Sequence, residues 1–125
     1  MDRVERGGTP PFRTAFVSPD HSAGVTIDRT PNAPGSPESI LGETEQTLRS
    51  SFPGYSRLSL RNVSVGRNQG AELTFKTDGR EVPPRGVTYL FFVRRDTYVV
   101  TGTGPSLDEI QSITNRMVGS LTARS

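Results

Sequence analysis

The segment 87–103 constrains the fold more than any other part of the chain, because it contains two long apolar strand patterns separated by a short polar break. A two-residue turn at Arg95-Asp96 would place Phe92 opposite Val99, although this turn lacks glycine and a longer loop stays open. One face of the hairpin then carries five large apolar side chains, Tyr89, Phe91, Val93, Tyr98 and Val100. The other face carries Leu90, Phe92 and Val99 among polar residues. Because both faces are apolar, we expect the hairpin at the centre of a sheet that is covered on two sides.

Two helices are predicted from their caps and apolar stripes. The first, at about 37–52, follows the cap residue Ser36 and stops at a Pro-Gly pair. The second, at about 107–121, follows a capping box in which Ser106 caps the helix and Glu109 reaches back to the Ser106 amide. Each helix carries an apolar stripe on one side, so each is expected to pack on the sheet.

The remaining strand patterns give the fold class. They lie at 12–17, 24–28, 58–65 and 71–76, with polar or glycine-rich turns between neighbours. The alternation within 58–65 changes parity at Arg61-Asn62, which predicts a bulge or a tight bend there. The order of two strands, a helix, four strands and a helix predicts an α+β fold, an antiparallel β-sheet with helices packed on it.

Length and the distribution of glycine and proline give the domain organisation. A chain of 125 residues fits one domain. Residues 1–11 are rich in glycine and proline, so we expect a flexible N-terminal arm there. Residues 12–125 are then expected to form a single domain.

The residue types that carry most enzyme chemistry are scarce. There is no cysteine, which excludes disulfides and thiolate chemistry, and His21 is the single histidine. Asp20, His21 and Ser22 are neighbours in one turn, where they would rarely point at one another as a catalytic triad must. The segment 102–106 lacks the lysine and the spacing of a phosphate-binding loop. We therefore expect no catalytic residue, no metal and no cofactor, and a protein that is not an enzyme.

The charge pattern bears on partners and compartment. The net charge is +2 and the 15 basic residues are scattered, so no nucleic-acid partner is expected. No apolar run approaches the ~18 residues of a membrane-spanning helix, so no integral membrane segment is expected. The charged N-terminus lacks the apolar core of a signal peptide. We expect a cytoplasmic protein as the sequence is written, and an extracytoplasmic one if an export signal has been removed.

The candidate partner-binding surface is the second face of the central hairpin. Leu90, Phe92 and Val99 would form an apolar patch there, with Arg94 and Arg95 at its rim. The alternative is that one helix covers each face and that these side chains belong to the core. Between the two lies a third arrangement, in which the helices leave part of the sheet uncovered and an apolar groove remains at one end.

The order of elements and five short stretches resemble the PsbP-like superfamily over residues 12–123. The stretches are GVTIDR at 24–29, FPGY at 52–55, GAELTF at 70–75, YVVTGT at 98–103 and GSL at 119–121. That group includes small actinobacterial lipoproteins and cytosolic chaperones of type VI secretion effectors. The resemblance implies an α/β/α layered fold and a non-enzymatic binding role, and it carries over no catalytic residue. It also implies, for the chaperones, a dimer whose sheets hold an apolar helix of a client.

Several functions stay open. The leading expectation is a non-catalytic binding or adaptor domain, such as a secretion-associated chaperone, that holds an apolar segment of a client protein. Its partners would be that client or a second copy in a homodimer. The alternatives are a small-molecule or lipid-binding domain of an exported protein or lipoprotein, a subunit of a larger assembly, and an enzyme whose site the sequence does not reveal.

Overall fold

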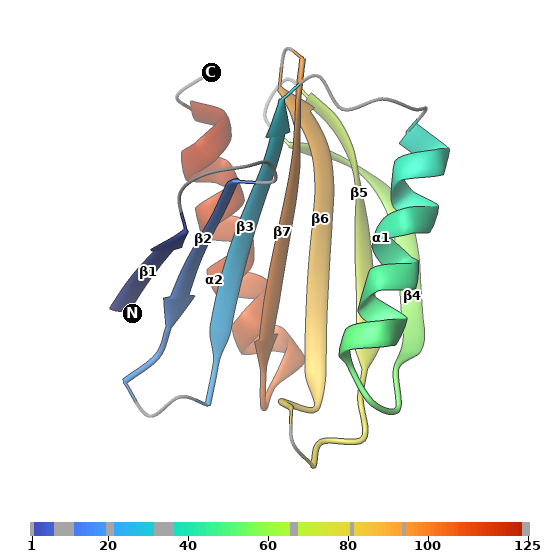
Figure 1. Ribbon diagram of the computed structural model, residues 1–125, viewed down its shortest axis with the longest axis vertical. Helices are drawn as coiled ribbons and strands as arrows, with labels where there is room; N and C mark the ends of the chain where they lie inside the picture. Colours follow the sequence, from blue (N-terminus) through green and yellow to red (C-terminus); the bar gives the residue numbers. More distant parts are fainter. Residues whose placement is uncertain are drawn as a thin grey trace.

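The computed structural model describes residues 2–6, 12–19, 22–31, 37–65, 68–80, 82–93 and 95–123. The strands are β1 (Asp2–Arg6), β2 (Phe12–Val17), β3 (Gly24–Pro31), β4 (Ser56–Val65), β5 (Asn68–Lys76), β6 (Arg85–Val93) and β7 (Asp96–Gly104). The helices are α1 (Pro37–Ser51) and α2 (Leu107–Ala123). The strands form one seven-stranded antiparallel sheet in the order β1-β2-β3-β7-β6-β5-β4, with β6 and β7 inside it (Figure 1). The α+β class with an antiparallel sheet, expected from the sequence, is confirmed.

The hairpin of β6 and β7 lies in a different register from the expected one. β6 ends and β7 begins with the pair Val93 and Asp96, and Phe92 lies opposite Thr97 instead of Val99. The expected turn was placed one residue too far along the chain. Because side chains alternate along a strand with a period of two, the resulting shift of the pairing by two positions leaves every residue on the face expected for it.

Both helices begin where their caps predict. α1 starts with Pro37, whose missing N–H costs nothing in the first turn of a helix. α2 starts after Ser106, whose Oγ accepts a long hydrogen bond of 3.5 Å from the backbone N–H of Glu109. The acidic side chains of Asp108 and Glu109 lie in the first turn, where the helix dipole favours negative charge.

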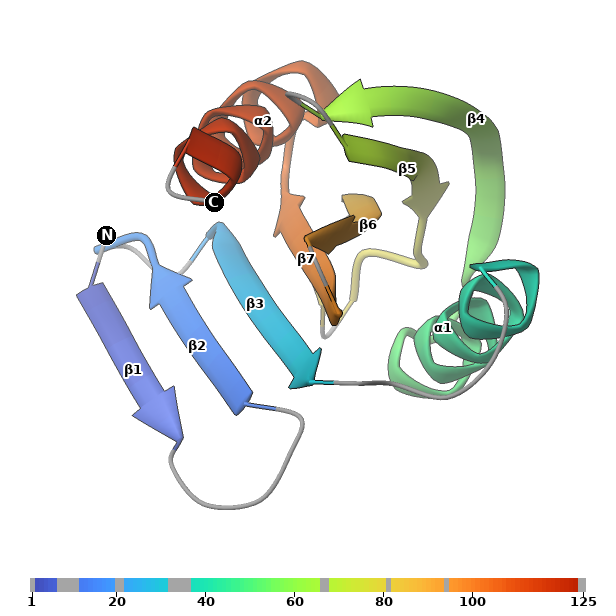
Figure 2. The same cartoon turned by 90° about the horizontal axis from the view of Figure 1, so that it is seen from above.

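α2 covers one face of the sheet and closes the larger core (Figure 2). The buried apolar side chains of this core are Ala23, Val25, Val87, Tyr89, Phe91, Val93, Val100, Ile110 and Val118. α2 approaches the sheet closely because glycine occupies the strand beneath it. A Cβ atom at Gly102 would lie 2.0 Å from Oγ1 of Thr114 on α2. The hairpin face that carries Tyr89, Phe91 and Val100 is therefore the one that α2 buries.

α1 lies over the opposite face, above β5 and β4 (Figures 1 and 2). Leu48 packs there on Leu73 and Phe75, all three of which are buried. The rings of Phe52 and Tyr55, which follow the helix, lie 5.3 Å and 5.2 Å from the ring of Phe75, centroid to centroid. Such tilted aromatic pairs add to the apolar burial. The contacts of α1 with the sheet are thus concentrated near its C-terminal end.

The N-terminal segment differs from the flexible arm that we expected for residues 1–11. Asp2–Arg6 form β1, which pairs antiparallel with β2 at one edge of the sheet. Residues 7–11 lie outside the described residues. Pairing at an edge needs only backbone donors and acceptors, so a short charged segment can add to a sheet without an apolar pattern of its own. The expectation of an arm is wrong for Asp2–Arg6.

β4 does not carry the irregularity expected at Arg61-Asn62. Leu60 pairs with Leu73 and Val63 with Gly70 in one continuous register, and the register shifts instead between Arg57 and Ser59. The change of parity has a different cause. Leu60 lies on the α1 face of the sheet, like its cross-strand partner Leu73, and is 38% exposed. Val63 lies on the opposite face and packs against the core under α2. The strand places apolar side chains on both of its faces.

Candidate functional site

A groove lies between α1 and the sheet. Its larger part is a hollow of about 550 Å³ between α1, β3 and β7. A smaller hollow of about 320 Å³ lies between the N-terminal part of α1 and strands β4, β5 and β6. The two adjoin, because Val99 of the larger hollow and Leu90 of the smaller one are cross-strand partners. We call the two hollows together the α1 groove.

Apolar side chains and hydroxyl groups line the α1 groove. The apolar side chains are Ile40, Leu41, Leu48, Phe52, Ala71, Leu90, Phe92 and Val99. The hydroxyl groups belong to Thr26, Thr30, Thr44, Thr47, Ser51, Thr97 and Thr101. The remaining polar side chains are Asp28, Glu38, Glu43, Asn62 and Gln69. Within the described part of the chain, no lysine or arginine lines the groove.

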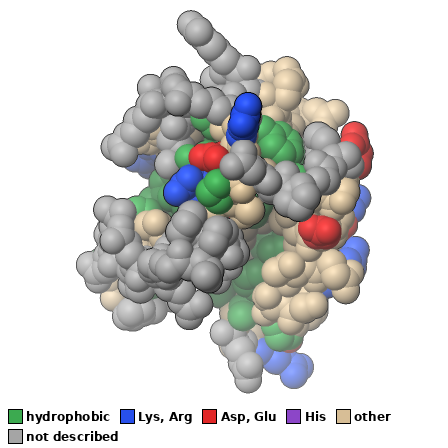
Figure 3. All heavy atoms as spheres, turned by 45° about the horizontal axis from the view of Figure 1, so that its top comes forward, with side chains coloured by type: hydrophobic (Ala, Val, Ile, Leu, Met, Phe, Trp, Pro, Cys, Tyr) green, Lys and Arg blue, Asp and Glu red, His purple; other side chains and the backbone are tan. Residues whose placement is uncertain are grey.

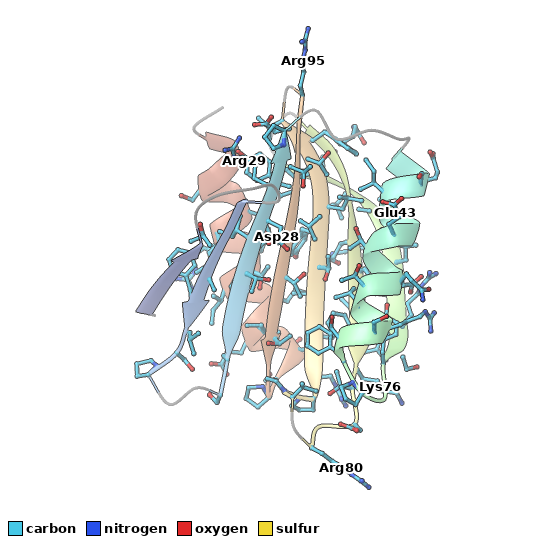
Figure 4. The ribbon with its side chains drawn as sticks, in the orientation of Figure 1. Asp28, Arg29, Glu43, Lys76, Arg80 and Arg95 are labelled. Atoms are coloured by element: carbon cyan, nitrogen blue, oxygen red, sulfur yellow. The ribbon has the colours of Figure 1, made fainter. Side chains whose placement is uncertain are left out.

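The groove exists because α1 is displaced toward one side of the sheet. The helix stands in front of β4 and β5, and the same face of β3 and β7 is not covered by it (Figures 1 and 4). Asp28 on β3 and Glu43 on α1 lie on opposite sides of the larger hollow (Figure 4). In Figure 3, hydrophobic side chains reach the surface in a recess near the middle of the view. The sheet thus has one face closed by α2 and one face partly open beside α1.

Several hydroxyl groups of the groove already donate hydrogen bonds within the fold. Thr44 Oγ1 donates to the carbonyl oxygen of Ile40 at 2.8 Å, and Thr47 Oγ1 donates to that of Glu43 at 3.0 Å. On the sheet, the hydroxyls of Thr88 and Thr101 are hydrogen-bonded at 2.9 Å. A hydroxyl that donates its one proton keeps lone pairs as acceptors. The helix wall of the groove therefore presents hydrogen-bond acceptors to an occupant.

The structure brings the three predicted apolar residues together at this groove. Leu90 is 3% exposed and lies at its floor, whereas Phe92 and Val99 are half-buried in its lining. Arg95 is exposed and extends away from the end of the hairpin, so it does not line the groove (Figure 4). Arg94 lies outside the described residues. The expected arginine rim is therefore not seen at Arg95, and the arrangement is the intermediate one, with a groove beside partial cover by a helix.

The sequence did not point to the other walls of the groove. Thr26 lies between Val25 and Ile27, which is the ordinary pattern of a half-buried strand, and Thr30 lies beyond the strand expected at 24–28. Only the pairing of Thr26 with Thr101 and of Thr30 with Thr97 places them in the same hollow. Ile40 and Leu41 belong to the apolar stripe of the helix predicted at about 37–52, a stripe that predicts packing on the sheet. No sequence signal distinguishes a stripe that fills a core from one that borders a groove.

An ionic network fixes the C-terminal half of α1 to the start of β4. Glu45 Oε2 accepts hydrogen bonds of 2.8 Å from the Tyr55 hydroxyl and 2.8 Å from Arg57 Nε, and Arg57 Nη2 also donates to Oε1. Arg49, one turn along the helix, lies 3.7 Å from the same carboxylate and 5.0 Å from the ring centre of Tyr55. The hydrogen bonds from Arg57 lower the pKa of Glu45 to about 2, against the opposing effect of burial. Burial and the bond to Glu45 raise the pKa of Tyr55.

A second carboxylate, Glu72, lies on the other face and outside the groove. It is 3% exposed, and its Oε1 accepts a 2.6 Å hydrogen bond from Nε of Arg61. Burial raises the pKa of Glu72, but hydrogen bonds from Arg61, Tyr89 and Gln111 outweigh it, and the pKa lies below its usual value. Burial also raises the pKa of Tyr89. The network joins β4, β5, β6 and α2, which gives it a structural role.

Features typical of enzymes and membrane proteins are a metal centre, a catalytic triad, a phosphate-binding loop and a membrane-spanning helix. Among the described residues, no group of three or more His, Cys, Asp or Glu side chains could hold a metal ion. Asp20 and His21, candidates for a triad, lie outside the described residues. Gly102 and Gly104, from the segment 102–106, lie at the end of β7. Gly102 packs against Thr114 and Ile110, and Gly104 packs against Ala23 and Ile110. None of the helices described here is long and apolar enough to span a membrane.

Comparison with known proteins gives a fold relative only. No protein-family model matches the chain, and no curated protein matches it. Among solved structures, it is similar to PA94 from Pseudomonas aeruginosa, a protein of unknown function that has been suggested to be a regulator. The TM-score is 0.66 at 12% sequence identity, and the match covers 94% of each chain. At this identity the similarity shows a shared fold, an antiparallel sheet with two helices.

Proposed function

We propose that this protein is a non-catalytic binding domain that holds an apolar segment of a partner protein in the α1 groove, as an adaptor or a secretion-associated chaperone does. The observation that carries the proposal is the position of Phe92 and Val99, two apolar side chains of the central hairpin that α1 leaves half-buried beside open space. Contiguous apolar surface on a small protein often marks an interaction site. Covering it would contribute about 25 cal/mol for each Å² removed from water.

A helical segment fits the groove better than an extended one. The floor of the groove is a face of the sheet, so it presents side chains, while the backbone groups of β3, β7 and β6 are paired with neighbouring strands. An extended segment on this floor would bury its own N–H and C=O groups against apolar side chains, which is costly. A helix satisfies these groups internally and presents apolar side chains at i, i+3 and i+4 spacing.

The charges around the groove favour a segment with basic ends. Glu38 and Glu43 of α1 are exposed beside the smaller and larger hollows, and the described lining includes no basic side chain. Exposed carboxylates attract a cation only modestly, typically by less than about 1 kcal/mol each. This is enough to favour lysine over glutamate at the ends of the bound segment.

Binding of a fluorescent Leu/Ala-rich helical peptide with lysines at both ends tests the proposal. Fluorescence anisotropy should show saturable binding to the wild-type protein, and the same peptide with glutamates at its ends should bind more weakly. Displacement by the unlabelled peptide shows that the binding is specific and reversible. A wild-type protein that binds neither peptide contradicts the proposed function.

Two neighbouring phenylalanines provide a matched pair of variants. Phe92→Ser removes a half-buried side chain from the groove and should weaken peptide binding about tenfold, equivalent to ~1.4 kcal/mol, while the fold is kept. Phe91→Ser removes a fully buried ring on the α2 face. Loss of a buried Phe costs about 3–5 kcal/mol, a large part of the roughly 5–15 kcal/mol of a typical domain. Circular dichroism should show that Phe91→Ser is unfolded or strongly destabilised; if Phe92→Ser behaves alike, Phe92 belongs to the core.

A small apolar ligand is a second candidate, because the larger hollow of about 550 Å³ lies in the usual size range of ligand sites, ~300–1,000 Å³. A lipid or another apolar molecule would fill this hollow alone. Val99→Ser, in the larger hollow, would then weaken binding of an uncharged fluorescent lipid analogue, whereas Phe92→Ser, in the smaller hollow, would not. A helical segment spanning both hollows is weakened by either change.

The same proposal includes that the chain is a member of the PsbP-like superfamily and that it forms a homodimer. An antiparallel sheet between two helices is compatible with the layered fold that the resemblance implies. Light scattering during size exclusion should give the molar mass of the wild-type protein at several concentrations. A mass of twice 13.6 kDa supports a homodimer, and 13.6 kDa at every concentration contradicts it.

A further inference from the structure

The two halves of α1 are held very differently. The C-terminal half is anchored by the burial of Leu48 on Leu73 and Phe75 and by the hydrogen bonds that join Glu45 to Tyr55 and Arg57. These contacts combine apolar burial with a charged network on one side of the helix. Movement of this half would require both to break together, so we expect it to stay fixed to β4 and β5.

The N-terminal half has open space on both flanks. The smaller hollow borders this half alone, at Glu38 and Leu41, whereas the larger hollow runs along both halves of the helix, from Ile40 to Ser51. Ile40 is 9% exposed and gives this half one buried apolar side chain, whereas Leu41 is half-buried. Little packing opposes a change in the distance between this half and the sheet.

The helix itself has low intrinsic stability at the boundary between the two halves. Gly42 lowers helix propensity by about 1 kcal/mol relative to alanine. Thr44 and Thr47 follow it, and their hydroxyls bond to the carbonyl oxygens one turn earlier, at Ile40 and Glu43. Such hydroxyl bonds slightly destabilise a helix and often bend it. Ser50 makes the same kind of bond to Gln46 in the anchored half, so Gly42 is the feature that lowers the cost of bending in the N-terminal half.

We infer that the N-terminal half of α1, from Glu38 to Thr44, is a movable wall of the α1 groove, which pivots about the anchored half and adapts the groove to its occupant. The inference rests on the proposed function for the identity of the occupant, an apolar helical segment. The motion itself is a property of the free protein. Since the anchored half remains in place, the wall can open without loss of the core under α2.

Spin labels measure this motion directly, because the chain contains no native cysteine. One protein carries labels at Ser39→Cys and Ser112→Cys, which keeps Gly42, and the matched control carries them at Ser50→Cys and Ser112→Cys. All three positions are exposed, and Ser112 lies on α2, across the sheet. Pulsed electron resonance of the free proteins should give a distance distribution about twofold broader for the Ser39 pair than for the Ser50 pair. Equal widths overturn the inference.

The lysine-flanked Leu/Ala peptide then separates the inference from the proposed function. When the peptide binds, the distribution of the Ser39 pair should shift and narrow, while that of the Ser50 pair stays unchanged. Peptide binding that leaves both distributions unchanged overturns the movable wall and leaves the proposed function intact. A broad Ser39 distribution in a protein that binds no peptide supports the motion and contradicts the proposed occupant.

Discussion

A Cβ atom at Gly86 would lie 2.2 Å from Cζ of Phe75. The ring of Phe75 therefore occupies the space that the side chain of any residue other than glycine would need at position 86. Phe75 is fully buried, and the rings of Phe52 and Tyr55 pack on it in tilted pairs at the C-terminal end of α1. The absence of a side chain at Gly86 therefore positions the helix that borders the groove.

Gly86→Ala should destabilise the protein by about 1–3 kcal/mol, because the methyl group forces the buried ring aside. Gly119→Ala is the control: an added Cβ there meets nothing within 4 Å, and alanine should stabilise α2. Urea unfolding monitored by circular dichroism gives both free energies. Equal stabilities of the two variants would contradict the close contact of Gly86 with Phe75.

The pH dependence of stability should reveal the network around Glu45. Its pKa in the folded state is about 2, below the value of about 4.3 for an unperturbed glutamate. Its contribution to stability is therefore present above about pH 4.3 and is lost as the pH falls toward 2. Because the network is partly exposed, we expect a loss of about 1 kcal/mol or less. Glu45→Gln should flatten the stability curve over this range, as measured by urea unfolding at several pH values.

Glu72 provides a test on the opposite face. Glu72→Ala should cost about 1–3 kcal/mol, because it leaves buried hydrogen-bond donors without an acceptor. Glu72→Gln keeps an acceptor oxygen and should cost less. Neither change touches the groove, so peptide binding at neutral pH should remain as in the wild type wherever the variant is folded. A strong loss of binding in folded Glu72→Gln would link the two faces of the sheet.

Gly42→Ala should stabilise the N-terminal half of α1 without filling the groove, because the methyl group meets no other atom. Hydrogen exchange at the amides of residues 41–44 should slow by up to about fivefold, which corresponds to the ~1 kcal/mol difference in helix propensity. Exchange at residues 48–51 should be unchanged. Uniform slowing along α1 would show that the helix moves as one piece.

The local elements of this protein could be predicted from the sequence. The cap at Ser106 and the proline at Pro37 set the starts of both helices, since capping and backbone geometry depend on a few neighbouring residues. The alternation in 87–103 separated Phe91 from Phe92 correctly, although the expected register was wrong. Face assignment depends only on parity, so it survives an error of two positions.

Only the tertiary structure decided where the groove lies. β3 pairs with β7, so Thr26 lies beside Thr101. The same pairing brings Nη1 of Arg29 within 3.2 Å of Oδ2 of Asp96, a residue far along the chain. The side of the sheet on which α1 settles depends on the fit of Leu48 against Phe75 and on the space above Gly86. The sequence by itself determined the elements and their apolar faces, because these follow from local periodicity. The structure decided which apolar face is filled and which is left open, because that depends on packing between segments distant in sequence.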